Sequence, residues 1–347
     1  MILVVGATGQ LGTAVCKRLA TEGYPVRAFV RPGSAYKHLE ALGVELVGGD
    51  LRNADSVRAA VAQVDAVVAT ANADVPGTAP LSFDEVEGDG YFNLVRACQR
   101  NPIDRLIFLS VPTTPYDDLV PTYRYKRVNE ERIRRSGVPY TIVRCAPFMD
   151  DWIAMMGSSV PLRGSEAHRL RRPFWFPRMF MMLTGRLMDG LNLALVPGTG
   201  WTRHAFVAVD DVAGFVIASL FRGEAEDRTF NVGGPEILTW DEAVDACSRV
   251  LGTPIRKVHV PSVAYRLQQL ALDRVSPHAA NLSGTAWIKS QWDTLILPSE
   301  AKPVLDGRDL TTVEQFFRRK MALAPVHGLA WRVRTSARAI KPSLRLE

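Results

Sequence analysis

Long apolar runs are missing from this sequence of 347 residues. No stretch of roughly eighteen uncharged apolar residues occurs, so we expect no membrane-spanning helix. The first residues, MILVVGATG, carry no basic region and run straight into a glycine motif, so no signal peptide is expected. With 47% hydrophobic and 22% charged residues, the composition is typical of a globular protein in water.

Paired cysteines are missing as well. The four cysteines, Cys16, Cys98, Cys145 and Cys247, lie far apart and form no CxxC pair. Such spacing is typical of reduced thiols and differs from the closely spaced ligands of a cysteine metal site. We therefore expect a cytoplasmic protein that has no disulfides and binds no metal.

Positive charge is unevenly distributed along the chain, whose net charge is +6. Eight Lys/Arg and one Glu lie between Arg318 and the end, which leaves 34 basic and 35 acidic residues elsewhere. A second basic cluster, Arg163 to Arg178, mixes arginines with aromatic residues. Both are either solvated or subunit-contact faces, or patches for peripheral contact with an anionic membrane or an acidic protein partner. No nucleic-acid-binding motif accompanies them, so no nucleic-acid partner is expected. The oligomeric state stays open.

Short β-rich runs alternate with helical segments over residues 1–145. The runs MILVV, PVRAFV, VELVG, DAVVAT, RLIFLS and PYTIVR are almost entirely apolar, as in strands buried on both faces of a parallel sheet. Helical segments separate them, which predicts right-handed βαβ units. We therefore predict an α/β fold, a Rossmann-type doubly wound parallel sheet with a smaller C-terminal α/β substrate or partner region.

The alternation breaks near residue 146. Residues 150–200 are rich in Met, Trp, Phe, Arg and Pro and have no clean period. Alternation returns afterwards, and we expect later strands to rejoin the first sheet. Two helical runs, VAYRLQQLALDRV and LTTVEQFFRRKMAL, follow with a polar loop between them. The predicted units are a dinucleotide-binding core (1–148), an insert and substrate region (149–260), and a helical extension with the basic tail (261–347).

A glycine motif, Gly6-Ala-Thr-Gly9-Gln-Leu-Gly12, stands between the first predicted strand and the first predicted helix. Glycines at this place allow a tight turn, close approach of the backbone to a diphosphate, and close contact between helix and strand. The helix N-terminus adds free N–H groups and a partial positive charge. In this context the motif predicts a dinucleotide site at the carboxyl ends of the strands.

Arg31 follows the second predicted strand, where a carboxylate would bind the ribose 2′-hydroxyl of NAD(H). A guanidinium there can bind a 2′-phosphate through two parallel hydrogen bonds. We therefore expect a preference for NADP(H), with NAD(H) as the alternative cofactor. A surface arginine without cofactor contact is the simpler interpretation. Asp50 and Leu51 end the third strand, within reach of an adenine, and Ala71 follows the fourth strand.

Several motifs together resemble the NmrA-like group of atypical short-chain dehydrogenases/reductases. They are GATGQLG, GDLRNADSV, GDGYFNLVRAC, LIFLSV, SGVPYTIVRCAPF, VAVDDVAGFVIASL and TFNVGGPEILTWDEAVDACSRVLG. The group includes NADPH-dependent reductases, and also cofactor-binding proteins that regulate or assemble other components. The resemblance implies that the cofactor-binding residues are Gly6, Thr8, Gly9, Gln10, Leu11, Gly12, Arg31, Asp50, Leu51, Ala71, Ser110, Val111, Lys126, Pro147 and Phe148.

The segment from Thr122 to Lys126 departs from the Tyr–Lys pair of many short-chain dehydrogenases, in which the tyrosine precedes the lysine by four positions. Helical residues four apart differ by roughly 40° and share a face, so Thr122 takes that place here. Tyr123 can still reach the pocket, whereas Tyr125 points away. The resemblance implies that Lys126 binds the ribose, and burial in the pocket would lower the pKa of a lysine and permit proton transfer. Lys126 and Tyr123 are therefore the catalytic candidates.

Binding of NADP(H), with hydride transfer to an apolar acceptor such as a quinone or a conjugated carbonyl compound, is the function that these features favour. Met149, Trp152, Met155 and Met156, with the run Phe174–Leu183, are candidates for an apolar substrate pocket. Core packing or a docking surface for a protein partner are the alternatives. The missing tyrosine and the basic tail favour a second hypothesis, a non-catalytic NADP(H)-binding redox sensor or an accessory protein of a membrane-associated complex.

Overall fold

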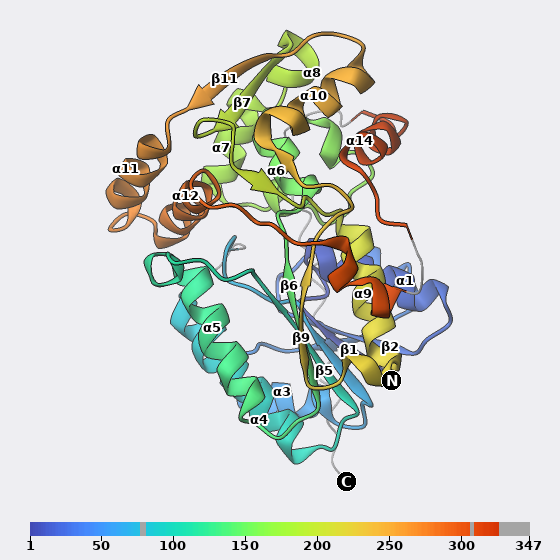
Figure 1. The fold of residues 1–347 in the computed structure, drawn as a ribbon. Coiled ribbons are helices and arrows are strands. Elements are labelled where there is room, and N and C mark those ends of the chain that lie inside the picture. Colours follow the sequence, from blue (N-terminus) through green and yellow to red (C-terminus); the bar gives the residue numbers. More distant parts are fainter. Residues whose placement is uncertain (77–80, 306–308, 326–347) are drawn as a thin grey trace.

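A sheet of seven parallel strands forms the centre of the computed structural model, which describes residues 1–76, 81–305 and 309–325 (Figure 1). Its order is β3-β2-β1-β4-β5-β6-β9, and every neighbouring pair is parallel. The predicted Rossmann-type α/β fold is thereby confirmed. The strands are β1 (Ile2–Val5), β2 (Val26–Val30), β3 (Glu45–Gly48), β4 (Ala66–Ala69), β5 (Arg105–Ser110), β6 (Tyr140–Cys145) and β9 (Arg228–Val232).

Apolar clusters on both faces of the sheet explain why its strands are continuous apolar runs in the sequence. Along β1, Ile2 and Val4 pack into one cluster, and Leu3 and Val5 into the other, because successive side chains of a strand point to opposite faces. The first face is covered by α1 (Gln10–Thr21), α2 (Lys37–Glu40), α9 (Val209–Phe221) and α13 (Lys302–Leu305). The second face is covered by α3 (Ala54–Val61), α4 (Tyr91–Arg100) and α5 (Pro121–Arg134).

A second region lies beyond the carboxyl ends of the central strands (Figure 1). The chain enters it after β6 and returns to the sheet with β9. Two small sheets belong to it, in which β7 (Leu193–Pro197) pairs with β11 (Arg256–Val260) and β8 (Arg203–His204) with β10 (Leu238–Thr239). Its helices are α6 (Met149–Met155), α7 (Trp175–Thr184), α8 (Leu187–Leu191), α10 (Trp240–Leu251), α11 (Ser262–Leu272), α12 (Pro277–Lys289) and α14 (Val313–Met321).

Core packing accounts for most of the methionine-rich segment at the start of this region. Met149, Trp152 and Met156 are buried in one cluster with Phe317 of α14, and Met155 packs against that cluster. Core packing, one of the two alternatives to a substrate pocket, therefore describes these methionines. Trp152 is also buried in this cluster, but it lines a cavity as well.

The segment FDEVEGDGYFNLVRACQR forms two helices rather than a single regular one. A π-helix, η1 (Asp84–Gly90), leads directly into α4. Such wide turns are rare and occur frequently at functional sites, and η1 carries the fully buried Glu87. The other short helical elements are the 3₁₀ turns η2 (Asp117–Leu119), η3 (Val160–Leu162), η4 (Arg169–Arg171), η5 (Gly223–Ala225) and η6 (Pro298–Glu300).

The prediction of a polar loop after α11 is wrong, because α12 lies there. Ser276 caps this helix by accepting the Ala279 N–H, and Pro277 stands in its first turn. The helix is buried on most of its sides, and several of its own buried residues are small, such as Ser283 and Gly284. Without an exposed polar face, the sequence has no amphipathic period to reveal a helix. The Ser-Pro pair at 276–277 is the one start signal that the sequence contains.

The basic tail lies mostly outside the described residues. Its first part, Arg318 to Lys320, is in the last turns of α14, and the remainder of that prediction concerns residues 326–347. Across the ranges that the structure does describe, no helix combines the length and the apolar character needed to cross a membrane.

Candidate functional site

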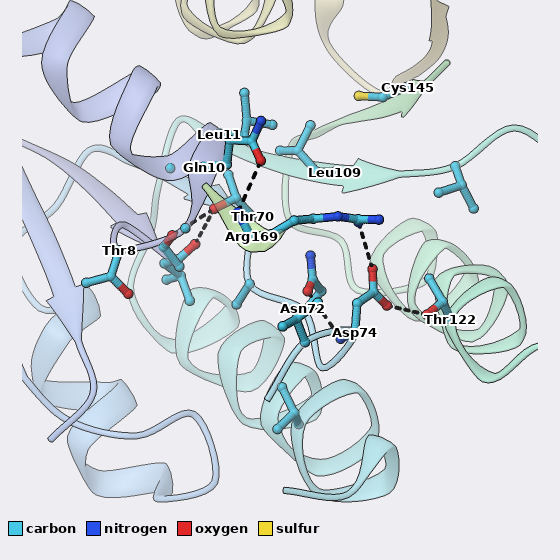
Figure 2. Close-up of a pocket in the computed structure, with 18 of the residues that line it drawn as sticks. Thr8, Gln10, Leu11, Thr70, Asn72, Asp74, Leu109, Thr122, Cys145 and Arg169 are labelled. Carbon is cyan, nitrogen blue, oxygen red and sulfur yellow. Dashed lines mark hydrogen bonds and ion pairs between the residues drawn. The ribbon is translucent and has the colours of Figure 1, made fainter. Parts of the chain in front are cut away.

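One cavity at the carboxyl ends of the central strands brings the predicted residues together. Its volume is about 250 Å³. Every residue that was predicted to bind the cofactor lines it, and so does Tyr123. Figure 2 shows side chains of the glycine loop, of the segment after β4 and of α5 around the same space. Residues chosen from separate motifs along the sequence therefore share one continuous site.

The glycine loop has the shape that a diphosphate requires. Gly6 has φ +86°, and a Cβ there would lie 2.5 Å from the Ala71 nitrogen. A Cβ on Gly12 would lie 2.2 Å from the Gly6 carbonyl oxygen, so a side chain would force the turn open. Gly9 is the N-cap of α1 and supplies no side-chain cap, which leaves N–H groups of the first turn for a ligand. Within the described residues, Gln10 Nε2 is buried without a hydrogen-bond partner. The residues present thus fit a dinucleotide.

Arginines gather where the adenosine part of a dinucleotide is expected. A second cavity of about 420 Å³ is lined there by Arg31, Ser34, Asp50 and Arg52. Burial lowers the pKa of Arg31, while Asp50 opposes and Arg52 reinforces that shift. Burial alone would raise the pKa of Asp50, but hydrogen bonds from Arg52 hold it below its usual value. Asp50 and Arg52 form an ion pair of 3.0 Å, so the Asp50 charge is largely engaged by Arg52 and Arg31 faces the cavity.

Lys126 lines the cavity in an ion pair that sequence reasoning missed. Its Nζ lies 3.5 Å from Glu87 Oε2 and 4.9 Å from the ring centroid of Phe108. Both charged partners are buried. The other oxygen of Glu87 accepts the Ala73 N–H at 3.1 Å. Burial raises the pKa of Glu87, and the Lys126 charge opposes that shift. The ion pair fixes the lysine nitrogen at the cavity wall, where ribose binding and proton transfer stay its predicted roles.

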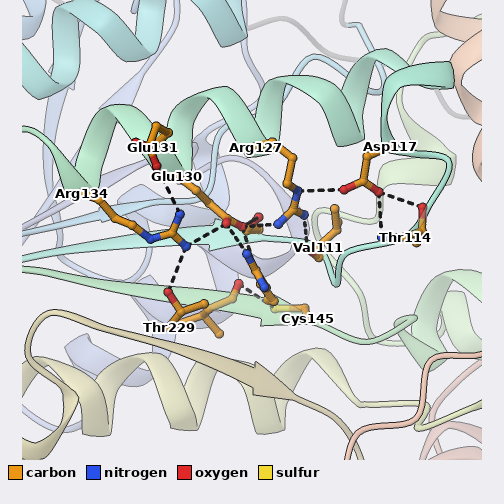
Figure 3. A network of polar contacts seen from close by, with 12 residues as sticks. Val111, Thr114, Asp117, Arg127, Glu130, Glu131, Arg134, Cys145 and Thr229 are labelled. Atoms are coloured by element: carbon orange, nitrogen blue, oxygen red, sulfur yellow. Dashed lines mark hydrogen bonds and ion pairs between the residues drawn. The ribbon is translucent and has the colours of Figure 1, made fainter.

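A buried network fixes the helix that carries Lys126 (Figure 3). Glu130 accepts hydrogen bonds from Arg127 at 2.6 Å and from Arg144 at 3.0 Å. The Ser110 hydroxyl donates to the same carboxylate at 2.6 Å. Burial would raise the pKa of Glu130, but Arg144, Arg127 and Ser110 hold it below its usual value. The network ties α5 to the ends of β5 and β6, and the Ser110 hydroxyl is engaged in it.

Side chains in the first turn of α5 point in different directions, because successive residues of a helix are rotated about its axis. The Thr122 hydroxyl contacts the Asp74 carboxylate (Figure 2). It also lies 3.0 Å from the Asn281 amide oxygen. Tyr123 is on the cavity wall, and burial raises the pKa of its phenol. Tyr125 packs against the core cluster of the second sheet face and does not line the cavity. Of the two tyrosines, Tyr123 is therefore the one within reach of a ligand.

The opposite wall of the cavity is made by residues that sequence reasoning missed. Arg169 lies between two carboxylates, with Nε 3.0 Å from Asp151 Oδ2 and Nη1 3.8 Å from Asp74 Oδ2. Figure 2 shows the contact with Asp74. The run Arg169 to Arg172 is visible in the sequence, but nothing in its spacing connects it with the glycine loop. The same wall also contains Arg172, Leu282 and Thr285.

Apolar side chains from several elements line the cavity in addition to the glycine loop. Leu109 of β5, Cys145 of β6, Trp152 of α6 and Leu282 of α12 line it. Burial raises the pKa of Cys145 to about 12, so its thiol stays neutral at physiological pH. The insert contributes parts of this wall and leaves the space itself open.

The apolar run Phe174–Leu183 does not contribute to the cavity. It forms α7, whose Met182 and Leu183 are 66% and 68% exposed, and Trp175 and Met179 are exposed as well. None of the residues of α7 lines the cavity. For this run the structure therefore disagrees with the substrate-pocket interpretation and leaves an exposed apolar helix face.

Comparisons with known proteins agree with this geometry. Residues 6–166 match the family model described as NAD(P)H-binding. The (4-alkanoyl-5-oxo-2,5-dihydrofuran-3-yl)methyl phosphate reductase of Streptomyces griseus subsp. griseus is 30% identical over 256 residues, which cover 74% of this chain and 76% of that protein. The photosystem II assembly factor Ycf39 of Synechocystis sp. is 24% identical over 332 residues, which cover 91% and 89% of the two chains.

A solved structure extends the comparison to the fold. The triphenylmethane reductase of Citrobacter sp., complexed with NADP(H), superposes with a TM-score of 0.68 at 18% identity and covers 92% of this chain and 100% of that one. The parallel sheet and its glycine-loop cavity define a Rossmann-type dinucleotide-binding protein. More specifically, the chain belongs to the NAD(P)H-binding family.

Proposed function

We propose that the protein is an NADP(H)-dependent reductase that delivers hydride to an apolar acceptor, such as a quinone or a conjugated carbonyl compound. The observation that carries the proposal is that one cavity is lined both by the glycine loop and by the apolar side chains of Leu109, Trp152 and Leu282. A bound reduced nicotinamide supplies the hydride. The chain itself would hold the cofactor, orient the acceptor and exclude water through these apolar side chains.

The preference for NADP(H) is supported by the charges at the adenosine end. Arg31 stands where a carboxylate would select NAD(H), and the nearby Asp50 carboxylate is paired with Arg52. A 2′-phosphate placed there would meet a guanidinium that matches its geometry. The likeness of the fold to a reductase complexed with NADP(H) is consistent with this choice.

Two residues of α5 are proposed to act at the reacting end. Lys126, which pairs with Glu87 at the cavity wall, would bind the ribose hydroxyls, and Tyr123 on the same wall would donate a proton to the acceptor. Burial keeps the Tyr123 phenol protonated, since it raises the pKa of that group. Thr122 is unsuited to the task because its hydroxyl is engaged by Asp74 and Asn281. For a quinone, the proton can instead come from water.

A panel of quinones and enones tests the reductase. Purified protein is mixed with NADPH, and the oxidation of the cofactor is followed for each acceptor. We expect turnover with apolar members of the panel. Thr285→Trp, which adds a bulky ring to the cavity wall one helical turn after Leu282, should abolish turnover and leave NADPH affinity nearly unchanged. Met179→Trp, on the exposed face of α7, is the matched control. Wild-type protein that binds NADPH and oxidises none with any acceptor would refute the proposal.

A second candidate function is a non-catalytic NADP(H)-binding protein that senses redox state or assists a membrane-associated complex. The exposed apolar face of α7 favours it, because such faces mark contacts with partners. One relative is named as a photosystem II assembly factor. The free, buried state of all four cysteines is consistent with a cytoplasmic or other reducing location for either function. The same panel separates the two candidates, since a sensor binds the cofactor without turnover.

A further inference from the structure

Arg172 faces the glycine loop although it belongs to the second region of the molecule. It follows the short turn η4, and its Nη2 lies 3.6 Å from the position of a Cβ built on Gly9. Its Nη1 donates a hydrogen bond of 3.2 Å to the carbonyl oxygen of Val75, after β4. The hydrogen bond to Val75 thus holds the guanidinium beside Gly9, at the N-terminus of α1.

The turn that carries Arg172 is anchored by its other residues. The Arg169 N–H donates to Gln10 Oε1 at 3.5 Å, and the Arg169 side chain binds Asp151 and Asp74. His168 adds a contact of 3.0 Å between Nε2 and the Asp150 carbonyl oxygen. Figure 2 shows Arg169 extended between Gln10 and Asp74. The backbone of the turn is thus tied to the cavity wall, which fixes where Arg172 can reach.

The charge of Arg172 is not neutralised by the protein, in contrast to that of Arg169. Within residues 1–76, 81–305 and 309–325, no carboxylate forms an ion pair with Arg172. Burial, together with the like charges of Arg31 and Arg169, lowers its pKa to about 10, against an opposing effect of Asp74. A partly buried cation among like charges is stabilised when an anion joins it. The geometry therefore calls for a ligand with negative charge.

We propose that Arg172 binds the diphosphate bridge of the dinucleotide from the side opposite the glycine loop. The proposal depends on cofactor binding by the proposed function and does not depend on turnover. The position beside Gly9 favours the diphosphate, because the second glycine of such a loop lets the backbone approach that group. Arg31 is then left to read the 2′-phosphate. Through Arg172 the second region of the chain would contact the cofactor directly. The position of the second region would then be coupled to cofactor binding.

Comparing the affinities for two nucleotides distinguishes a diphosphate contact from a 2′-phosphate contact. NADPH and NADH share the diphosphate and differ in the 2′-phosphate. Affinities for both are measured by titration calorimetry with wild-type protein, Arg172→Ala, Arg172→Lys, Arg31→Ala and Arg178→Ala. Arg178 is an exposed arginine of the same basic cluster and serves as the matched control. The thermal midpoint of each variant without nucleotide reports whether the fold is preserved.

Loss of the diphosphate contact should weaken both nucleotides alike. We expect Arg172→Ala to lower both affinities by about tenfold or more, as for a lost charge-assisted hydrogen bond, and to leave their ratio unchanged. Arg172→Lys should recover part of the loss, because it restores the charge without the fork. Arg31→Ala should reduce the ratio, and Arg178→Ala should change neither affinity.

Three outcomes would overturn the assignment. If Arg172→Ala binds both nucleotides as wild type does, Arg172 makes no cofactor contact. If it lowers the NADPH affinity alone, as expected of Arg31→Ala, Arg172 reads the 2′-phosphate instead. If wild-type protein binds neither nucleotide, the proposed function fails and the assignment fails with it. The first two leave the proposed function intact, so the failures are distinguishable.

Discussion

The two walls of the cavity are built in different ways. On the core wall, Gly6, Gly12 and Arg31 come from two neighbouring strand–loop–helix units, and each is placed by the backbone next to it. On the opposite wall, Arg172 and Leu282 come from a turn and a helix that are distant in the sequence and depend on tertiary packing. Local geometry thus provides the glycine loop and Arg31 of the dinucleotide site, whereas the packing of the second region places Arg172 and the apolar side chain of Leu282 on the facing wall.

Lys126→Met on the core wall should have the largest effect on stability. The Glu87 carboxylate, 3.5 Å from the lysine nitrogen, would be left buried without its partner, and breaking a buried ion pair in this way costs about 3–5 kcal/mol. Urea unfolding at neutral pH measures the loss. The double variant Glu87→Gln/Lys126→Met is the matched control, because it removes both charges and should regain most of that stability.

The stability loss in Lys126→Met should also depend on pH. Burial raises the pKa of Glu87 above its usual 4.5, so the folded state binds this proton more tightly than the unfolded state does. Binding of this proton to Glu87 stabilises the folded state fully below pH 4.5, and the stabilisation is lost as the pH rises through the folded pKa of Glu87. Without the lysine charge the folded pKa rises further, so the loss should shrink as the pH falls toward 4.5. A loss that is the same at every pH would contradict a charged Glu87.

Gly12→Ala should break the core wall with a smaller effect on stability. Its Cβ would lie 2.2 Å from the Gly6 carbonyl oxygen, and such overpacking costs about 1–3 kcal/mol. Because the loop must open to relieve the clash, we expect binding of both nucleotides to be lost. Gly190→Ala is the control: its Cβ has no neighbour nearer than 3.7 Å, and it lies in α8. Equal nucleotide affinities of Gly12→Ala and wild type would refute the role of the loop.

Arg31→Ala should change selectivity rather than stability. Loss of a charge-assisted hydrogen bond of about 1.5–3 kcal/mol corresponds to a fall in NADPH affinity of roughly ten- to a hundredfold. NADH affinity should stay the same, because NADH lacks the 2′-phosphate. Arg58→Ala, which removes an exposed arginine of α3, controls for the change in net charge. Titration with NADPH and with NADH measures both affinities. An unchanged ratio of the two affinities would show that Arg31 does not bind the 2′-phosphate.

Met182→Ser should have the smallest effect, since α7 belongs to neither wall. The side chain is 66% exposed, and surface changes of this kind usually alter stability by less than about 0.5 kcal/mol. Nucleotide affinity and turnover should match wild type. A clear fall in turnover with unchanged stability would place α7 at the acceptor site and undo the distinction between the cavity walls and this outer face.

The core wall could be predicted from the sequence because its signals are local. Strand β1 is an apolar run that ends at Gly6, and Arg31 directly follows the next predicted strand, so the order of the chain indicates which residues meet. The regular βαβ repeat then places the strand ends side by side. All the cofactor-binding residues chosen in this way line the cavity, and their contacts with a cofactor stay predictions.

The rest could not be predicted because it depends on distant contacts. Glu87 reads as an ordinary helix residue, and only the π-helix and the neighbouring α5 bring it to Lys126. The small residues of α12, such as Gly284, have no amphipathic period since the helix is buried on most sides. Arg172 has no motif around it, and its position over Gly9 follows from the packing of the second region.

The most direct test of the proposed reaction is the fate of the hydride. NADPH that carries deuterium at the transferable position of its nicotinamide is mixed with the protein and an apolar enone, and the product is analysed by mass spectrometry. An enone suits the test because the new C–H bond does not exchange with water. We expect one deuterium per product molecule in wild-type protein. NADPH that binds and is not oxidised, or a product without deuterium, would contradict direct hydride transfer in this cavity.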